Sequence, residues 1–155
     1  MIVDQKHRMK SRGICVIVPT YNNAGTIVDV VSRCQAQCDD VIVVCDGCTD
    51  NTVQLLEAMA VPPVILDLGH NRGKGIALRE GFRYALQAGC AYAITLDGDG
   101  QHFPEDIPVL VEANIKHPGA LIVGARKNLE NAERSGNRSE CQADNVPSAR
   151  RTRNC

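Results

Sequence analysis

Tryptophan is absent from this sequence of 155 residues, and aromatic residues make up only 3% of it. Stacking platforms for single-stranded nucleic acid therefore have little material. The formal net charge is -1, which argues against the concentrated basic face of a nucleic-acid-binding protein. No apolar run reaches the roughly 18 residues that a membrane-spanning helix needs, and residues 1–13 lack the apolar stretch of a signal peptide. The sequence thus indicates no nucleic-acid partner and, at most, peripheral association with a membrane.

What the sequence does contain is ordinary for a soluble globular domain: 44% hydrophobic residues and 23% charged residues. Eight cysteines suggest a disulfide framework only in a short secreted protein, and that context is missing. We therefore expect a cytoplasmic protein whose cysteines serve as small apolar core residues.

Five short apolar runs recur along the chain, each rich in Val and Ile and bounded by Gly, Pro, Asp or Asn. Their length and composition predict strands. Continuous rather than alternating apolarity is typical of strands that are buried on both faces in a parallel sheet. The runs are residues 14–18, 41–45, 64–68, 91–96 and 120–123.

Helical patterns separate these runs. The second helix follows Thr49 and Asp50, either of which could be its N-cap, and the fourth begins near Pro104 or Pro108 and runs to about Lys116. The apolar stripes of the first three are Ile27, Val30, Val31, Cys34 and Cys38; Val53, Leu56 and Ala60; and Leu78, Phe82, Ala85 and Leu86. The predicted fold is α/β, a Rossmann-like, open and mostly parallel sheet with flanking helices.

Three segments follow from this pattern: a polar N-terminal extension at 1–13, the α/β domain at 14–126, and a tail at 127–155. The tail is mostly polar or charged, with Leu129 and Val146 as its isolated aliphatic residues. Such a stretch buries too little apolar surface to offset its ordering entropy, so we expect it to be largely disordered. Its abrupt onset also fits a truncated or frame-shifted coding sequence.

The sharpest motif is the turn at 97–101, where Asp97 and Asp99 follow the fourth apolar run. Two carboxylates in a glycine-relaxed turn repel one another unless a cation lies between them. Hard oxygen ligands favour Mg²⁺ or Mn²⁺, and Gln101 could add a carbonyl oxygen. An EF-hand loop is excluded, because its sixth and twelfth positions would be His102 and Pro108 instead of Gly and Glu.

Other polar segments follow the other strands, and ligands of open α/β sheets gather at such strand ends. Asp46 could accept hydrogen bonds from a base or ribose there, whereas Asp50 has a structural role available as a helix cap. The run at 71–75 places two cations and two glycines at a helix start, which favours an anion such as phosphate. It is not a Walker loop, because its glycine spacing is too short and Gly75 stands where Ser or Thr is required.

Cys45 and Cys48 form a CxxC pair, and Cys34 and Cys38 lie one helical turn apart. Together they could form a zinc or redox site. Since three of the four fall on predicted core positions, we favour core packing and keep the zinc or redox module as a non-enzymatic alternative.

With these segments in order, the chain resembles the family 2 glycosyltransferases, and among them enzymes similar to dolichyl-phosphate mannosyl- and glucosyltransferases. The matching segments are 17–22, 46–50, 71–75 and 97–101, spread over about residues 14–126. The resemblance implies the N-terminal, donor-binding part of a GT-A fold, a nucleoside-diphosphate-sugar donor, and a metal-assisted glycosyl transfer to a polyprenyl phosphate or glycan acceptor. A nucleotide-sugar nucleotidyltransferase remains the enzymatic alternative, disfavoured because 20–22 lacks that class's glycine-rich basic loop.

The resemblance also implies roles for particular residues. Asn23, Cys45 and Cys48 depart from the family pattern, which bears on the identity of the nucleotide. The general base of such enzymes lies in a C-terminal half, so no catalytic residue is assigned here. The implied metal ligands are Asp97, Asp99 and Gln101. The implied donor-binding residues are Pro19, Thr20, Tyr21, Asn22, Asp46, Arg72, Lys74, Gly75, Asp97 and Gly98.

Overall fold

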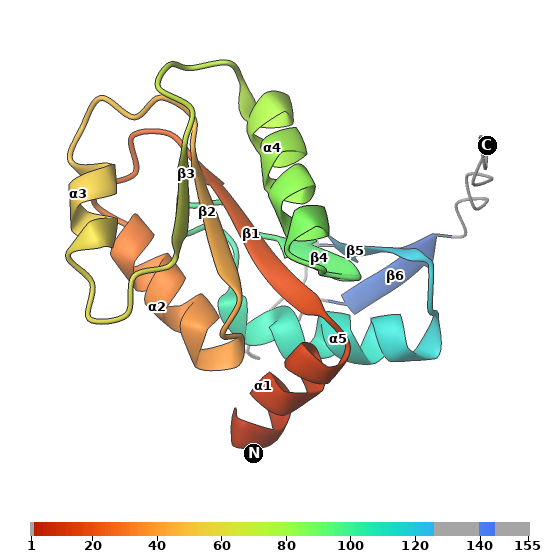
Figure 1. The fold of residues 1–155 in the computed structure, drawn as a ribbon. Helices are drawn as coiled ribbons and strands as arrows, with labels where there is room; N and C mark the ends of the chain where they lie inside the picture. The colour runs from red at the N-terminus through yellow and green to blue at the C-terminus, as the bar shows by residue number, and fades with distance from the viewer. Residues whose placement is uncertain (1, 126–139, 145–155) are drawn as a thin grey trace, which may run out of the picture. The chain divides into compact units, whose positions relative to one another are not determined.

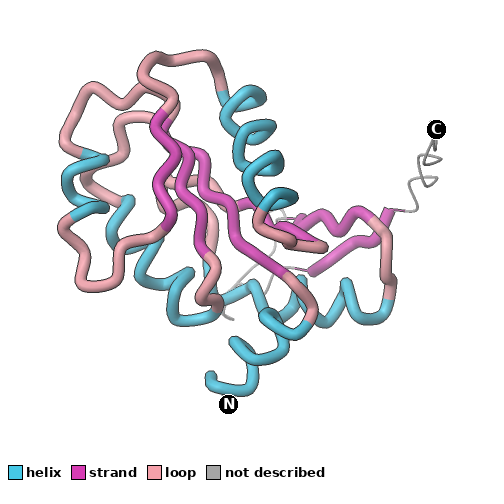
Figure 2. The backbone as a smooth tube through the Cα atoms, in the orientation of Figure 1, coloured by secondary structure: helices cyan, strands magenta, loops and turns pink. Residues whose placement is uncertain are grey.

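The computed structural model describes residues 2–125 and 140–144 of the chain (Figures 1 and 2). The chain folds as two compact units, Met1–Ile107 and Pro108–Cys155. The first unit carries every polar strand-end segment identified above.

The first unit is built on a four-stranded sheet with the order β3-β2-β1-β4. All three strand pairs are parallel, as predicted. The first two connections step outward in one direction, and the third returns to the other side of β1. The order therefore reverses between β1 and β4, which is where open α/β sheets bind ligands. The strands are β1 (Ile14–Thr20), β2 (Val41–Cys45), β3 (Val64–Asp67) and β4 (Tyr92–Thr95).

Burial separates the two central strands from the two outer ones. Every residue of β1 and β2 is buried, which confirms the interpretation of their continuous apolar runs. By contrast, β3 and β4 contain only half-buried and exposed residues, because each pairs on one side only within this sheet. The two buried strands β1 and β2 thus form the centre of the sheet, and the polar loops follow their carboxyl ends.

Helix α4 (Lys74–Gln87) packs on one face of the sheet through small residues (Figure 1). Its buried positions are Ala77, Gly81 and Ala85. A Cβ on Gly81 would lie 2.7 Å from Cγ2 of Ile17, so the helix approaches β1 too closely for any side chain there. The predicted stripe was wrong for Phe82 and Leu86, which are exposed, because the stripe followed large apolar residues and the contact requires small ones.

Helix α2 (Ile27–Gln37) covers the other face, and its five predicted stripe residues are all buried. Helix α3 (Thr52–Glu57) follows β2 and buries Leu56, whereas Ala60 lies beyond its end and is exposed. The segment 1–13 forms helix α1 (Ile2–Ser11), in which Met9 is fully buried and Lys6 forms an ion pair with Asp39. The N-terminal segment is therefore a packed helix.

The carboxyl-terminal elements start with a short 3-10 helix, η1 (Pro104–Asp106), followed by α5 (Ile107–Lys116), which agrees with both proline positions suggested as helix starts. The fifth predicted strand, β5 (Leu121–Ala125), forms but is not part of the parallel sheet: it pairs antiparallel with β6 (Glu140–Asp144) in a separate two-stranded sheet. Strand β6 lies within the tail that was expected to be largely disordered, so that expectation is wrong for residues 140–144. The rest of 127–155 lies outside the described residues. Among the described residues, no helix is long and apolar enough to cross a membrane.

Candidate functional site

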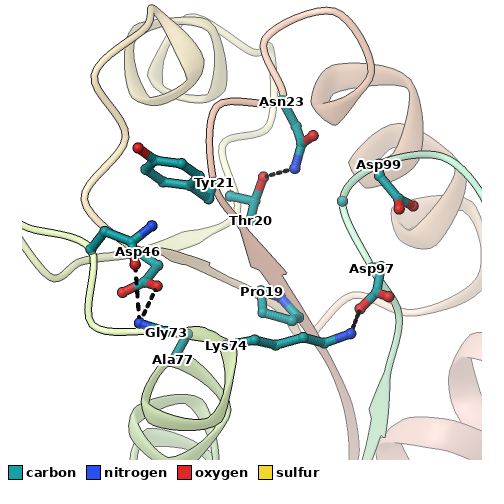
Figure 3. Close-up of a pocket in the computed structure, with 12 residues that line it drawn as sticks. Pro19, Thr20, Tyr21, Asn23, Asp46, Gly73, Lys74, Ala77, Asp97 and Asp99 are labelled. Atoms are coloured by element: carbon teal, nitrogen blue, oxygen red, sulfur yellow. Dashed lines mark hydrogen bonds and ion pairs between the residues drawn. The ribbon is translucent and has the colours of Figure 1, made fainter.

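The carboxyl ends of β1, β2 and β4 converge on a pocket of about 380 Å³ in the first unit (Figure 3). Parallel pairing sets this convergence, since Thr20 pairs with Cys45 and Ile17 pairs with Thr95. The loops that leave these strands supply most of the lining. The pocket is lined by Pro19, Thr20, Tyr21, Asn23, Asp46, Asn71, Gly73, Lys74, Ala77, Asp97, Gly98 and Asp99.

Asp46 organises the loop that precedes α4. Its carboxylate is only 4% exposed, and its two oxygens accept hydrogen bonds from the backbone N–H groups of Arg72 and Gly73, each at 2.8 Å. Next to it, Gly47 has a φ of 70°, and a Cβ there would lie 2.2 Å from the backbone carbonyl carbon of His70. The two loops are thus locked together by charge-assisted hydrogen bonds and by backbone contact that only glycine permits.

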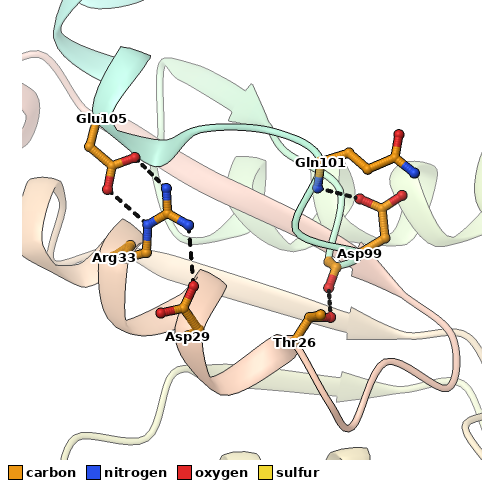
Figure 4. A network of polar contacts seen from close by, with 7 residues as sticks. Thr26, Asp29, Arg33, Asp99, Gln101 and Glu105 are labelled. Carbon is orange, nitrogen blue, oxygen red and sulfur yellow. Dashed lines mark hydrogen bonds and ion pairs between the residues drawn. The ribbon is translucent and has the colours of Figure 1, made fainter. Parts of the chain in front are cut away.

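The turn that carries the two acids is held from both sides. The Thr26 hydroxyl donates to the Gly98 carbonyl oxygen at 2.8 Å, and Gly98 N–H donates to the carbonyl oxygen of Pro19 at 3.3 Å. Within the turn, Gln101 N–H donates to Oδ1 of Asp99 at 2.9 Å (Figure 4). These contacts fix the turn against β1 and the start of α2.

An ion-pair cluster anchors the chain just after this turn (Figure 4). Arg33 of α2 donates from Nε and Nη2 to the two carboxylate oxygens of Glu105, at 2.8 and 2.5 Å, and from Nη1 to Asp29 at 3.2 Å. The hydrogen bonds from the guanidinium lower the pKa of Glu105 below its ordinary value. The bidentate geometry ties η1 to α2, so both ends of the acidic turn are restrained.

Lys74 and Asp97 meet across the pocket. Lys74 is the first residue of α4, and its Nζ lies 2.6 Å from Oδ1 of Asp97 (Figure 3). On the other side of Asp97, its backbone N–H donates to Nδ1 of His102 at 3.0 Å. The pocket thus has a cation from the helix start facing the acidic turn, as the combined anion and metal sites would require.

The chemistry of the pocket fits a hard divalent cation. Asp97 and Asp99 both line it, and they bring carboxylate oxygens, the ligands that Mg²⁺ and Mn²⁺ prefer. Among residues 4–124, no group of three or more His, Cys, Asp or Glu side chains forms a complete metal cage. Two carboxylates suit an ion that completes its shell with substrate phosphates and water.

Most of the residues predicted for the site line the pocket, and four of them do not. Asn22, at a φ of 52°, instead holds the next loop: its Oδ1 accepts Thr49 N–H at 2.8 Å. Arg72 contributes its backbone to the Asp46 contact, and Gln101 contributes its backbone to the acidic turn. Gly75, the fourth, lies exposed in the first turn of α4.

Asp50 has a structural role, but neither it nor Thr49 is the N-cap of α3, so that prediction was wrong. Its Oδ1 accepts the N–H of Thr52 at 3.0 Å at the start of α3, and its Oδ2 accepts the N–H of Ala24 at 3.1 Å. Asn51 occupies the N-cap position itself. The carboxylate therefore ties the β2–α3 loop to the β1–α2 loop beside the pocket.

Four lining residues were not among the predicted ones: Asn23, Asn71, Gly73 and Ala77. Asn23 donates from Nδ2 to the Thr20 hydroxyl oxygen at 2.9 Å. Asn71 precedes Arg72 in the quoted loop, and Ala77 lies one helical turn after Gly73. Helical spacing was the signal available for Ala77, because a residue one turn beyond the anion-binding start shares its face.

Cys34, Cys38 and Cys45 are buried core residues, and Cys48 is half-buried. Burial raises the pKa of the Cys45 thiol to about 12, with the neighbouring Cys48 contributing in the same direction. Burial likewise raises the pKa of Cys34 to about 12 and that of Cys38 to about 11. A reactive redox centre needs accessible thiolates of lowered pKa. Among the described residues, no group of three or more His, Cys, Asp or Glu side chains could hold a metal ion, so both observations disfavour the zinc or redox module.

An open parallel sheet with an acidic turn and a helix start at its switch point is typical of nucleotide-binding α/β domains. The family model described as glycosyl transferase family 2 matches residues 15–154, and the chain belongs to this family. The predicted family is confirmed, the nucleotidyltransferase alternative is not supported, and the fold is the nucleotide-binding part of the GT-A type.

Two relatives have names that describe sugar transfer to lipid phosphates. The chain is 28% identical over 152 residues to the UDP-N-acetylglucosamine–dolichyl-phosphate N-acetylglucosaminyltransferase of Methanococcus voltae, covering 83% of this chain and 61% of that protein. It is 32% identical over 125 residues to the undecaprenyl-phosphate 4-deoxy-4-formamido-L-arabinose transferase of Yersinia enterocolitica, covering 74% and 37%. The chain thus spans only part of the relatives it matches.

Solved structures share the fold. The glucosyl-3-phosphoglycerate synthase of Mycobacterium tuberculosis, solved with Mn²⁺, UDP and glucosyl-3-phosphoglycerate, superposes with a TM-score of 0.59 at 23% identity. The match covers 80% of this chain and 47% of the synthase. At this identity the likeness establishes the fold.

Proposed function

We propose that the pocket binds the nucleoside diphosphate of a sugar donor together with Mg²⁺ or Mn²⁺, and that the protein transfers the sugar to a polyprenyl phosphate in glycolipid or cell-wall synthesis. The observation that carries the proposal is the meeting of Lys74, Asp97, Asp99 and Asp46 in one pocket at the switch point of the sheet.

The diphosphate end of the donor belongs at the start of α4. Gly73 occupies the N-cap position at a φ of 95°, and the backbone N–H groups of the first turn, together with Lys74, supply positive charge. No acidic residue lies in that turn to oppose an anion. Gly73 lines the pocket and a Cβ there would meet no atom within 4 Å, which leaves space for phosphate oxygens to approach the backbone.

The nucleoside end belongs beside Tyr21 and Asp46. Tyr21 is 45% exposed at the pocket, so its ring is available for stacking on a base (Figure 3). Both oxygens of Asp46 already accept backbone N–H groups, and each keeps a further lone pair for a base or ribose donor.

Asp97 and Asp99 would hold the divalent ion, and Gln101 remains a predicted additional ligand. Bound there, the ion would supply Lewis-acid stabilisation of the diphosphate leaving group. The chain's own residues position the acids: Thr26 and Arg33 restrain the turn, and Lys74 balances the charge of Asp97. No described residue is proposed as the general base.

The acceptor and the location rest on the relatives. Those named above act on dolichyl and undecaprenyl phosphates, so we propose a polyprenyl phosphate acceptor in preference to a glycan. We propose that the protein works at the cytoplasmic surface of the membrane, where nucleotide sugars and lipid phosphates meet, through peripheral association at most.

Calorimetric titration of the chain with UDP and GDP, in Mn²⁺ and in EDTA, tests the proposal. We expect one of the two nucleotides to bind at least about 10-fold more tightly with Mn²⁺. Asp99→Asn should abolish that dependence. Asp40→Asn is the matched control, because Asp40 is exposed and precedes β2 at the opposite edge of the sheet. Equal binding with and without metal, or no binding of either nucleotide, would overturn the proposal.

A further inference from the structure

Lys74 contacts the carboxylate of Asp97, which is one of the two proposed ligands of the divalent ion. Its Nζ contacts Oδ1 of Asp97 at 2.6 Å, and the side chains of the pair are 60% and 29% exposed (Figure 3). An ammonium at this distance takes up one lone-pair site of the carboxylate and repels a divalent cation, so it opposes the binding of a metal ion to the same group. Without a nucleotide, the lysine therefore competes with the cation for Asp97.

Lys74 also lies beside the site proposed for the diphosphate. It is the first residue of α4, directly after Gly73, at the helix start where the proposed donor's diphosphate would lie. A diphosphate carries more charge than one carboxylate, so its arrival draws the flexible ammonium away from Asp97. The freed carboxylate oxygen then becomes available to the cation.

We propose that Lys74 couples the two ligands: it holds Asp97 until a nucleoside diphosphate arrives, and its transfer to the diphosphate opens Asp97 to the divalent ion. The inference rests on the function proposed above and adds a binding order to it. Nucleotide raises the affinity for the ion, and by linkage the ion raises the affinity for nucleotide by the same factor. The pocket consequently holds little metal when no donor is present.

The competition between Lys74 and the divalent ion for Asp97 predicts a measurable change in Mn²⁺ affinity. A largely exposed ion pair changes a competing equilibrium by about two- to fivefold. In the Lys74→Met variant, Mn²⁺ alone should bind more tightly by about that factor. UDP or GDP should bind more weakly, because its cation at the helix start is gone. The factor by which nucleotide raises Mn²⁺ affinity should therefore shrink.

The experiment measures free Mn²⁺ by electron paramagnetic resonance during titration of the wild-type and variant chains, with and without saturating nucleotide, after subtraction of the Mn²⁺ that nucleotide binds in solution. Arg79→Met is the matched control: it removes a cation from the same helix, and Arg79 is 69% exposed with a 3.9 Å contact to Glu80. The control should leave both Mn²⁺ affinity and coupling near the wild-type values. Lys74→Gln serves as a second variant, and circular dichroism verifies that each variant is folded.

The outcomes separate the two proposals. If the wild-type chain binds Mn²⁺ and nucleotide cooperatively while Lys74→Met and Lys74→Gln bind Mn²⁺ alone no more tightly than wild type, the coupling role is wrong and the donor site stands. An equal gain in Arg79→Met would mean that general positive charge, and not the Lys74 contact, governs the ion, which also overturns the proposal. A wild-type chain that binds neither ligand contradicts the function itself.

Discussion

Replacing Asp46 by Asn tests how the donor loop is built. The two carboxylate oxygens accept the N–H groups of Arg72 and Gly73, both at 2.8 Å, and the side chain is 4% exposed. An Asn side chain keeps one acceptor oxygen, and its NH₂ group then faces the second backbone N–H. One of the two hydrogen bonds is lost, the other loses its charge assistance, and one backbone donor is left without its partner at a largely buried residue.

The size of the effect follows from these contacts. A hydrogen bond to a charged group contributes about 1.5–3 kcal/mol, and an unsatisfied buried donor costs about 1–3 kcal/mol. Because the loop can relax toward solvent, we expect Asp46→Asn to lower the free energy of unfolding by about 2–4 kcal/mol. Nucleotide affinity should fall by at least about 10-fold, since the loop shapes the pocket.

Urea denaturation followed by circular dichroism gives the first quantity, and calorimetric titration with Mn²⁺ and nucleotide gives the second. Asp67→Asn is the control: Asp67 accepts a single N–H, from Gly69 at 2.9 Å, and is exposed. Asp67→Asn should lower the free energy of unfolding by less than about 1 kcal/mol. If Asp46→Asn unfolded at the same urea concentration as the Asp67 variant, the reasoning about the loop would be refuted.

Three further changes have defined outcomes. Gly47→Ala should cost at least about 2 kcal/mol in urea denaturation, since the added Cβ meets backbone at 2.2 Å and the φ of 70° disfavours alanine; stability equal to wild type would contradict the close approach. Thiol labelling near pH 8 should modify the half-buried Cys48 while leaving Cys45, with its pKa raised to about 12, unreacted until unfolding; early labelling of Cys45 would contradict its burial. Arg33 lowers the folded pKa of Glu105, so their contribution is present above the ordinary value of 4.5 and is lost as pH falls through the folded value. The stability difference between wild type and Glu105→Gln should therefore shrink between about pH 6 and pH 3, and a difference independent of pH would refute the pair.

The sheet could be predicted well because its signal is local. Continuous Val and Ile runs identified β1 and β2, and their complete burial follows from the same apolarity. A short apolar run does not show whether its strand lies at the edge of the sheet. The exposure of β3 and β4 could therefore be predicted only once the strand order was known. For helix α4 the apolar periodicity predicted the wrong buried residues, because its contact with β1 depends on how closely the backbones approach at Gly81.

In the site, too, some features could be predicted from the sequence and others could not. Parallel strands bring their carboxyl ends together, so the meeting of Asp46, Lys74 and Asp97 could be predicted from the order of motifs. The bonds from Asp46 to backbone N–H groups could not, because every residue but proline carries that donor and the sequence does not mark which is used. The contact between Lys74 and Asp97 likewise depends on the rotamers of an exposed lysine and a half-buried aspartate.

The central claim is that Asp97 and Asp99 share one divalent ion with a nucleoside diphosphate. Crystals of the chain grown with Mn²⁺ and UDP or GDP, measured for the anomalous signal of manganese, test it most directly. We predict one manganese peak in the pocket, within about 2.0–2.6 Å of a carboxylate oxygen from this pair and of a phosphate oxygen. Bound nucleotide in the pocket with no manganese beside Asp97 or Asp99 would contradict the account.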